Sequence, residues 1–153
     1  MSQDFHMNRE ELQGLCENEP QKMVEIYESL LMSYHIQQAR LDALLETVNE
    51  AICIIDESDT VVVWNPCAEH LYGIAAKDIL HKPIEHFFSN LMLTKVMKER
   101  RTVHEEYHTP CPDTHVLINA MPVKLSGQVI GGVCAERDIT EVVRLNQKLS
   151  KTH

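Results

Sequence analysis

The sequence predicts an α+β fold, in which short helices gather on one face of a five-stranded antiparallel sheet, with a long helix before it and a linker helix after it. Three observations predict this fold. Residues 1–50 have helical spacing, residues 51–137 change to short apolar runs in the order two strands, small helices, three strands, and residues 138–153 return to helical spacing. With 153 residues, of which 44% are hydrophobic, the chain can bury a core without disulfides or metals.

Residues 1–50 are expected to form an N-terminal helical or coiled-coil extension. Asn8, with Glu11 three residues later, has the pattern of a capping box for a short helix, and Pro20 suits the first turn of a longer one. Along the longer helix, apolar and aromatic side chains recur at heptad spacing, interrupted by Gln37. They are Tyr27, Leu30, Tyr34, Leu41, Leu44 and Val48. Either this row packs on its own domain, or it joins two chains in a parallel coiled coil whose register Gln37 fixes. We expect the homodimer.

The segment 51–140 is expected to be one domain that opens with a β-hairpin. Apolar runs at 51–56 and 60–65 are separated by a polar turn. Asn65, followed by proline, is typical of a helix start, and Gly73 is typical of a helix end. Two helical turns and a longer helix are expected next.

Three strand-like runs complete the predicted sheet, at 102–109, 115–123 and 128–137. Prolines and a Lys-Leu-Ser-Gly turn separate them. The pair Gly131-Gly132 lies inside the last run, where the missing side chains would allow close backbone packing. Because side chains alternate along a strand, Val116, Ile118 and Ala120 should share one face of the sheet.

Residues 141–153 are expected to form a C-terminal signalling helix. Asp138 has the position of its N-cap, and Glu141 three residues later would complete a capping box. Val142, Leu145 and Leu149 then continue at heptad spacing. The amphipathic pattern runs up to the end of the sequence, so we expect an effector domain to follow it in a longer parent protein.

The order of these elements resembles that of the PAS sensor domain over roughly residues 44–143. The segment LLETVNEAICIID is similar to the start of the family's first strand, and WNPCAEHLYGIAAKDILHKP is similar to its Asn-led helix and Gly-aromatic turn. INAMPVKLSGQVIGGVCAERDITE resembles its last two strands and ends in the family's Asp-Ile-Thr signature, here Asp138, Ile139 and Thr140. One departure is His81, where many relatives carry glycine.

The resemblance implies a ligand cavity between the sheet and the short helices. The candidate lining residues are Val116, Ile118, Ala120, Val133 and Cys134. The alternative is a filled core with no room for a ligand. The resemblance also assigns structural or signalling roles to Asn65, Asp138, Ile139, Thr140 and Glu141, because the Asn65 turn begins the wall of the cavity and the Asp-Ile-Thr junction leads to the effector.

No cofactor is predicted. The family's flavin-binding subclass uses a cysteine on its helical flank, and its haem-binding members take an axial histidine from the long helix; residues 87–97 contain neither. A hairpin carries four potential zinc ligands, with His104 and His108 expected on one strand face. These ligands are His104, His108, Cys111 and His115. Nothing in the sequence forces them to converge, so we predict no metal site.

Composition narrows the function. The net charge of −9 argues against direct nucleic-acid binding. No apolar run is long enough to span a membrane, and the five cysteines are scattered, so we expect a cytoplasmic protein with reduced thiols. No catalytic motif is present, and we expect no enzyme activity.

The resemblance then implies a sensory and dimerisation module of a bacterial signal-transduction protein, which binds a small ligand or a partner. The exit segment AERDITEVVRLNQKLS is similar to the linker before the ATPase of sigma-54-dependent transcriptional activators, and this is the effector we expect. The alternatives are the sensor module of a histidine kinase and a ligand-free dimerisation scaffold.

Overall fold

The computed structural model describes residues 7–89 and 91–151, and the chain divides into two compact units, residues 1–44 and 45–153. Two helices come first in the described part of the chain, α1 (Arg9–Asn18) and α2 (Pro20–Thr47). The Asn8 Oδ1 atom accepts a hydrogen bond from the Glu11 backbone N–H at 2.8 Å, and the Asn8 side-chain amide donates to the Glu11 carboxylate at 3.3 Å. The predicted N-cap of α1 and the start of α2 at Pro20 are therefore confirmed.

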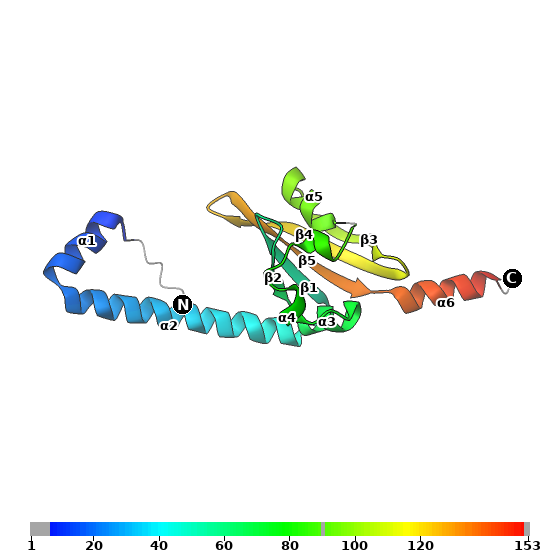
Figure 1. Ribbon diagram of the computed structural model, residues 1–153, viewed down its shortest axis with the longest axis horizontal. Coiled ribbons are helices and arrows are strands. Elements are labelled where there is room, and N and C mark those ends of the chain that lie inside the picture. The colour runs from blue at the N-terminus through cyan, green and yellow to red at the C-terminus, as the bar shows by residue number, and fades with distance from the viewer. Residues whose placement is uncertain (1–6, 90, 152–153) are drawn as a thin grey trace. The chain divides into compact units, whose positions relative to one another are not determined.

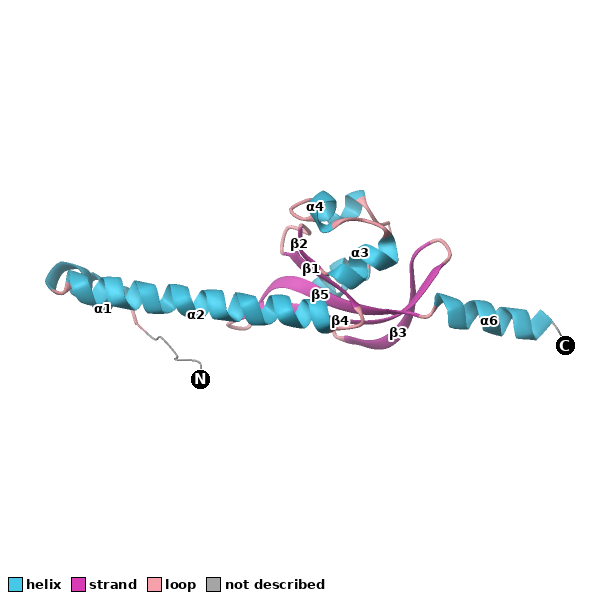
Figure 2. Cartoon of the chain, turned by 90° about the horizontal axis from the view of Figure 1, so that it is seen from below, coloured by secondary structure: helices cyan, strands magenta, loops and turns pink. Residues whose placement is uncertain are grey.

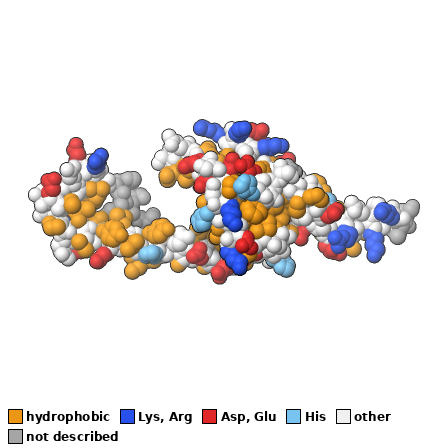
Figure 3. Space-filling view, viewed as in Figure 1, with side chains coloured by type: hydrophobic (Ala, Val, Ile, Leu, Met, Phe, Trp, Pro, Cys, Tyr) orange, Lys and Arg blue, Asp and Glu red, His pale blue; other side chains and the backbone are white. Residues whose placement is uncertain are grey.

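The long helix α2 has 28 residues, and none of them is buried. Tyr27 and Tyr34 in the heptad row are 64% and 61% exposed. In Figure 3, hydrophobic side chains gather over α1 and the N-terminal part of α2. The helix ends at Thr47, so Val48 lies one residue beyond it. Within the described ranges, none of the helices combines the length and the apolar composition that crossing a membrane requires.

The second unit is built on an antiparallel sheet of five strands in the order β2-β1-β5-β4-β3 (Figure 1). The strands are β1 (Ala51–Asp56), β2 (Val61–Trp64), β3 (Val103–Cys111), β4 (Thr114–Leu125) and β5 (Gln128–Asp138). The β1–β2 hairpin and the three consecutive C-terminal strands confirm the predicted α+β fold.

Short helices connect β2 to β3 and cover one face of the sheet, with α3 and α4 on the same side in Figure 2. They are α3 (Pro66–Tyr72), α4 (Ala76–Ile79), the 3-10 turn η1 (Ile84–His86) and α5 (Met92–Glu99); α6 (Thr140–Lys151) leaves the last strand. Between the sheet and these helices lies the core, whose most deeply buried side chains include Ile55, Ile79, Val96 and Ile118.

Strand β5 packs closely against its neighbours at two glycines. A Cβ atom added to Gly131 would lie 2.3 Å from the carbonyl oxygen of Ile55 on β1. A Cβ atom added to Gly132 would lie 3.0 Å from Cγ of Met97 on α5. The predicted role of this pair in close packing is confirmed.

The turn before η1 contains the residue at which the sequence departs from many PAS relatives. His81 has φ 66°, a left-handed conformation that glycine adopts without steric cost. Its backbone N–H donates to the carbonyl of Val61 at 2.8 Å, which holds the turn against β2. Histidine therefore occupies a backbone conformation that favours glycine.

Strand β3 contains a bulge that changes which side chains face the core. Val103 pairs with Ala120 and Glu106 with Ile118, so three steps along β3 oppose two steps along β4. Glu105, at the bulge, has φ 47°. The extra residue reverses the alternation, and the prediction that His104 and His108 share a face is wrong. His108 is buried, whereas His104 is exposed.

Candidate ligand pocket

Asn65 fixes the point at which the sheet passes into the helices. The residue is buried, and all of its side-chain polar atoms are used. Its Oδ1 atom accepts hydrogen bonds from the backbone N–H groups of Ala68 at 3.0 Å and Ile52 at 2.8 Å. Its amide nitrogen donates to the carbonyls of Leu45 at 3.1 Å and Glu50 at 2.9 Å. Asn65 is therefore the N-cap of α3, as predicted, and it also ties the end of α2 to β1.

The helix that Asn65 starts places an aromatic ring over the sheet. Helix α3 ends at Gly73, which has φ 66° and whose N–H donates to the Glu69 carbonyl at 2.8 Å. The Trp64 indole N–H donates to the carbonyl of Ile74 at 2.9 Å, and this hydrogen bond ties the segment after α3 to β2. Tyr72, in the last turn of α3, is thereby held beside Trp64.

A cavity lies between these helices and the inner face of the sheet. Counted as the space open to the centres of water-sized spheres, its volume is about 40 Å³. One water molecule needs roughly 10–15 Å³ on this measure, so the cavity has room for a ligand of a few non-hydrogen atoms. Its walls are formed by Cys53, Trp64, Tyr72, Ile84, Phe88, Leu91, Met92, Leu93, His108, Pro110, Ile118, Cys134 and Glu136.

Three aromatic rings form one side of the cavity. The ring centroids of Tyr72 and Phe88 are 4.9 Å apart in an edge-to-face arrangement. Trp64 lies 5.6 Å from Tyr72 and 6.1 Å from Phe88. Because the three residues come from β2, α3 and the segment before α5, the cluster joins elements far apart in the sequence.

A buried carboxyl group faces the same cavity. Glu136 on β5 is only 7% exposed. The Tyr72 hydroxyl donates to Glu136 Oε2 at 2.7 Å, and the Cys134 thiol lies 3.7 Å from Oε1. Burial raises the pKa of Glu136, although these two donors act in the opposite direction. Burial and the neighbouring carboxylate likewise raise the pKa of the Tyr72 hydroxyl.

Two thiols lie opposite each other at the floor of the cavity. Cys53 on β1 pairs with Cys134 on β5, and both are buried, free thiols. The hydrogen bond between them, followed by burial, raises the pKa of the Cys134 thiol. Cys134 is therefore held in its protonated form and is a poor nucleophile.

The structure places the predicted pocket residues in three positions. Ile118 and Cys134 line the cavity. Val116 and Ala120 are buried in the core on the same face of β4. Val133 lies on the other face of the sheet, in a shallow apolar depression, because alternate residues of a strand point to opposite faces.

Sequence reasoning missed the polar and aromatic part of this pocket. Trp64, Tyr72, Phe88, His108 and Glu136 all line the cavity. Glu136 could have been found, because it lies two residues after Cys134 and therefore on the same face of the strand. His108 could not, because the β3 bulge that turns it inward has no clear sequence signal.

The four potential zinc ligands of the β3–β4 hairpin do not converge. His104 and His108 lie on opposite faces, the Cys111 thiol donates to the Thr114 hydroxyl at 3.3 Å, and His115 stacks on Tyr107 with centroids 5.7 Å apart. Across residues 7–89 and 91–151, no group of three His, Cys, Asp or Glu side chains is placed to hold a metal ion.

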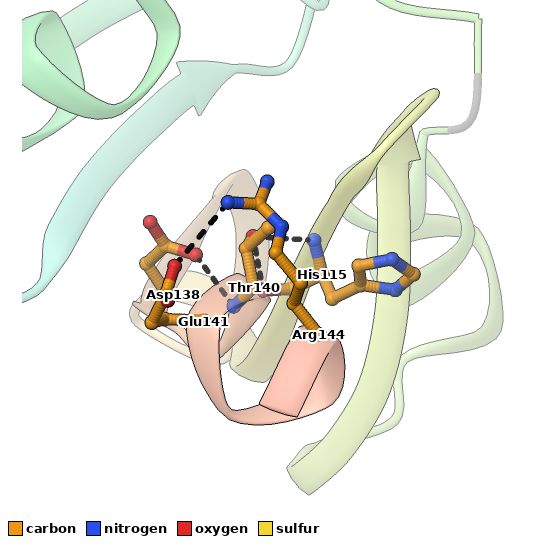
Figure 4. Close-up of polar contacts among 5 residues, drawn as sticks. All are labelled: His115, Asp138, Thr140, Glu141 and Arg144. Carbon is orange, nitrogen blue, oxygen red and sulfur yellow. Dashed lines mark hydrogen bonds and ion pairs between the residues drawn. The ribbon is translucent and has the colours of Figure 1, made fainter. Parts of the chain in front are cut away.

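The junction between β5 and α6 is fixed to the neighbouring strand (Figure 4). The backbone N–H of Thr140 donates to Asp138 Oδ1 at 2.9 Å. The Thr140 hydroxyl accepts from the backbone N–H of His115 at 3.0 Å, and the Ile139 N–H donates to the His115 carbonyl at 2.9 Å. The first turn of α6 is therefore anchored to the start of β4.

The predicted capping box at this junction is wrong in its second half. Helix α6 begins at Thr140, and Asp138 is the last residue of β5, paired with Val116. The Glu141 carboxylate lies 3.3 Å from Arg144 on the next turn, instead of returning to the Asp138 N–H. Because Asp138 belongs to the sheet, it caps α6 from one residue further out than predicted.

Comparison with known proteins gives one family. The family model described as PAS domain matches residues 49–141, which is more than half of the chain. The sensor histidine kinase DcuS of Escherichia coli (strain K12) is 28% identical over 109 residues, covering 70% of this chain and 20% of the kinase. A probable C4-dicarboxylate sensor kinase of Bacillus subtilis (strain 168) is 20% identical over 132 residues, covering 86% of this chain and 22% of that protein. The chain thus spans about a fifth of these relatives.

Solved structures share the fold. The structure described as the E. coli DhaR(N)-DhaL complex matches with a TM-score of 0.62 and 17% identity, covering 72% of this chain and 38% of that chain. The PAS domain of Bordetella pertussis BvgS matches with a TM-score of 0.55 and 21% identity, covering 78% of this chain and 98% of that one. At these identities the likeness concerns the fold alone.

Proposed function

The chain belongs to the PAS domain family, and from this premise we propose that it is the sensory and dimerisation module of a signal-transduction protein. In this proposal a small ligand enters the cavity between sheet and helices, and the change is relayed to an effector through α6. The module binds and relays, and carries out no reaction of its own.

One observation carries this proposal: strand β5 holds both the cavity and the exit junction. Cys134 and Glu136 line the cavity, and Asp138 is the next residue on the same side of the strand. Asp138 in turn holds Thr140 at the first position of α6. A ligand that displaces Glu136 therefore acts two residues from the start of the exit helix.

We propose a histidine kinase as the parent protein. The curated relatives that match over most of this chain are sensor kinases, and they support this alternative at least as much as the transcriptional activator expected from the sequence. The sequence of α6 favours the sigma-54-dependent activator as the second candidate. Sequencing the parent gene beyond residue 153 distinguishes them, since a kinase has a phosphoacceptor histidine in the helix that follows and an activator has an ATPase module.

The dimerisation part of the proposal rests on α2. A 28-residue helix with no buried residue and an apolar row at heptad spacing fits a second copy of itself in parallel. Leu44 in the row is 59% exposed, and Leu145 and Leu149 on α6 are 52% and 62% exposed, so both helices leave apolar side chains for a partner. Light scattering of the wild-type chain at micromolar concentration tests this, and a monomer would contradict it.

The relay is tested by the substitution Asp138→Ala in the full-length parent protein. The variant should stay folded and dimeric, because loss of such a cap costs only about 1 kcal/mol, but its response to the inducing condition should weaken. Coupling between linked sites is typically about 1–3 kcal/mol, which is comparable to the cap. Arg144→Gln, which removes an exposed ion pair at the start of the same helix, is the control. A wild-type response of the Asp138→Ala protein would show that the junction is only structural.

The alternative of a ligand-free scaffold is tested by native mass spectrometry of the purified chain. A bound small molecule supports the sensory proposal. A wild-type protein that carries none, and whose parent is equally active with a cavity-filling Ile118→Phe substitution, would favour the scaffold.

A further inference from the structure

We infer that the cavity takes a small organic cation of the alkylammonium class. This inference rests on the proposed sensory function and names the ligand chemistry of its site. It is drawn from three features of the cavity. They are a buried carboxyl group that can accept further hydrogen bonds, an aromatic wall, and a volume that admits a ligand of only a few non-hydrogen atoms.

The first feature is the hydrogen bonding of Glu136. Both contacts to its oxygens come from donors of the protein, the Tyr72 hydroxyl and the Cys134 thiol. A carboxylate can accept about four hydrogen bonds, so acceptor positions remain toward the cavity. A ligand that uses them has to donate hydrogen bonds.

The second feature is the aromatic wall, whose Tyr72 hydroxyl is hydrogen-bonded to the carboxyl group. Trp64, Tyr72 and Phe88 lie within 4.9–6.1 Å of one another and all line the cavity. Aromatic faces attract cations, most strongly where water is excluded, and recognition of ammonium groups by clustered aromatic rings follows from this. A cation with an N–H group can interact with the faces of the rings and donate a hydrogen bond to the carboxylate, whereas the Glu136 carboxylate would repel an anion.

The third feature is size. A volume of about 40 Å³ limits the ligand to roughly the bulk of three water molecules, as in methylammonium or ethylammonium. Such amines stay protonated over the physiological pH range, like the lysine side chain. The cation would also supply a counter-charge for the buried carboxylate. Burial raises the pKa of Glu136 in the empty cavity, and a bound cation favours the carboxylate, so binding should release protons.

The experiment is a calorimetric titration of the 153-residue chain with ethylammonium chloride. Ethanol is the neutral probe with the same number of non-hydrogen atoms, and sodium chloride of equal ionic strength is the salt control. Ethylammonium should bind and ethanol should not. In two buffers of different ionisation enthalpy the heats should reveal proton release, and affinity should increase with pH through the raised pKa of Glu136.

Variants identify the groups responsible. Glu136→Gln should weaken binding by about 10- to 100-fold, the loss expected for a hydrogen bond to a charged group, while the exposed Glu57→Gln control should not change it. Phe88→Leu, which keeps the site apolar, should weaken it by about 2- to 30-fold. The other titratable side chains lining the cavity are Cys53, Tyr72, His108 and Cys134, and a His108→Gln variant, which removes the imidazole among them, should retain the proton release.

The outcomes separate this inference from the proposed function. Ethanol binding as tightly as ethylammonium would leave a ligand pocket but overturn the cationic assignment. Heats no greater than those of sodium chloride would overturn it as well, and a native mass spectrum that still contains a neutral ligand would then keep the sensory proposal. A wild-type response in the Asp138 test, by contrast, would overturn the proposed relay and leave the cation site intact.

Discussion

The long helix α2 and the sheet of the second unit use their apolar residues in opposite ways. No residue of α2 is buried, although its row contains tyrosines and leucines. On the sheet, Ile55, Val61, Val116 and Ile118 are almost completely buried. The difference teaches that a heptad row and a strand alternation are both apolar patterns with different fates. The strand alternation is buried in the core of the second unit, whereas the heptad row on α2 is exposed.

The largest effect is expected where the two regions meet, at Asn65. The substitution Asn65→Ala removes four hydrogen bonds and leaves backbone groups of β1 and the end of α2 without their partner. It should lower the free energy of unfolding of the second unit by about 3 kcal/mol. Urea unfolding followed by fluorescence of Trp64, the single tryptophan of the chain, measures this. Asn8→Ala, the same change at the N-cap of α1, should leave the Trp64 transition where it was.

The next effect concerns the interior of the sheet alone. Gly131→Ala places a Cβ atom 2.3 Å from the Ile55 carbonyl, and both groups belong to backbone that cannot move freely. We expect a loss of about 2 kcal/mol in the same unfolding measurement. Gly132→Ala is the matched control, because its new atom meets the flexible side chain of Met97 at 3.0 Å. Equal losses in the two variants would contradict the packing argument.

A substitution in the helix should change assembly and leave the sheet intact. Leu41→Lys places a charge in the proposed seam between two α2 helices, which should weaken the dimer by about 2 kcal/mol, or roughly 30-fold in its dissociation constant. Sedimentation velocity over a concentration series measures the constant. The near-ultraviolet circular dichroism of Trp64 should be unchanged. Gln37→Leu is the contrasting variant, since removing the polar position should strengthen the association while relaxing its register.

The smallest effect is a pH dependence confined to the pocket. The pKa of Glu136 is raised in the folded state by burial, so the folded state holds its proton more tightly than the unfolded chain does. The stability contributed by this group is fully present below the unfolded pKa and is lost as the pH rises through the folded pKa. Glu136→Gln should therefore gain stability relative to the wild type as the pH rises over that window, and Glu57→Gln should not. Parallel stability curves for Glu136→Gln and wild type would refute the assignment.

The sequence predicted local features better than the contents of the pocket. The caps at Asn8, Asn65 and Gly73 were predictable because one or two neighbouring residues determine them. The order of strands followed from their periodicity and from the resemblance to PAS domains. Asp138 was placed correctly as the group that caps α6, but the start of that helix was displaced by one residue, because the strand pairing with Val116 competes for the same backbone.

The pocket was harder to predict because its wall is assembled from separate elements. Tyr72 reaches Glu136 across 64 positions of sequence, and no local pattern links them. The aromatic cluster could not be predicted from a local pattern either, because Phe88 lies in an irregular segment between η1 and α5. Among the polar residues, only the inward position of Glu136 was implied by alternation along β5.

The bulge in β3 means that this strand has one residue more than the paired segment of β4. Because Glu105 is one residue more than the pairing with β4 requires, residues 106–108 are in the opposite phase to the residues before it. Deleting Glu105 would remove the bulge and leave His108 opposite Val116, because three steps along β3 would become the two steps that β4 requires. The pairings on both sides of the bulge would therefore be the same with or without this residue. The lining of this cavity can thus tolerate a one-residue change in strand length at the bulge, whereas a substitution changes one group of the wall.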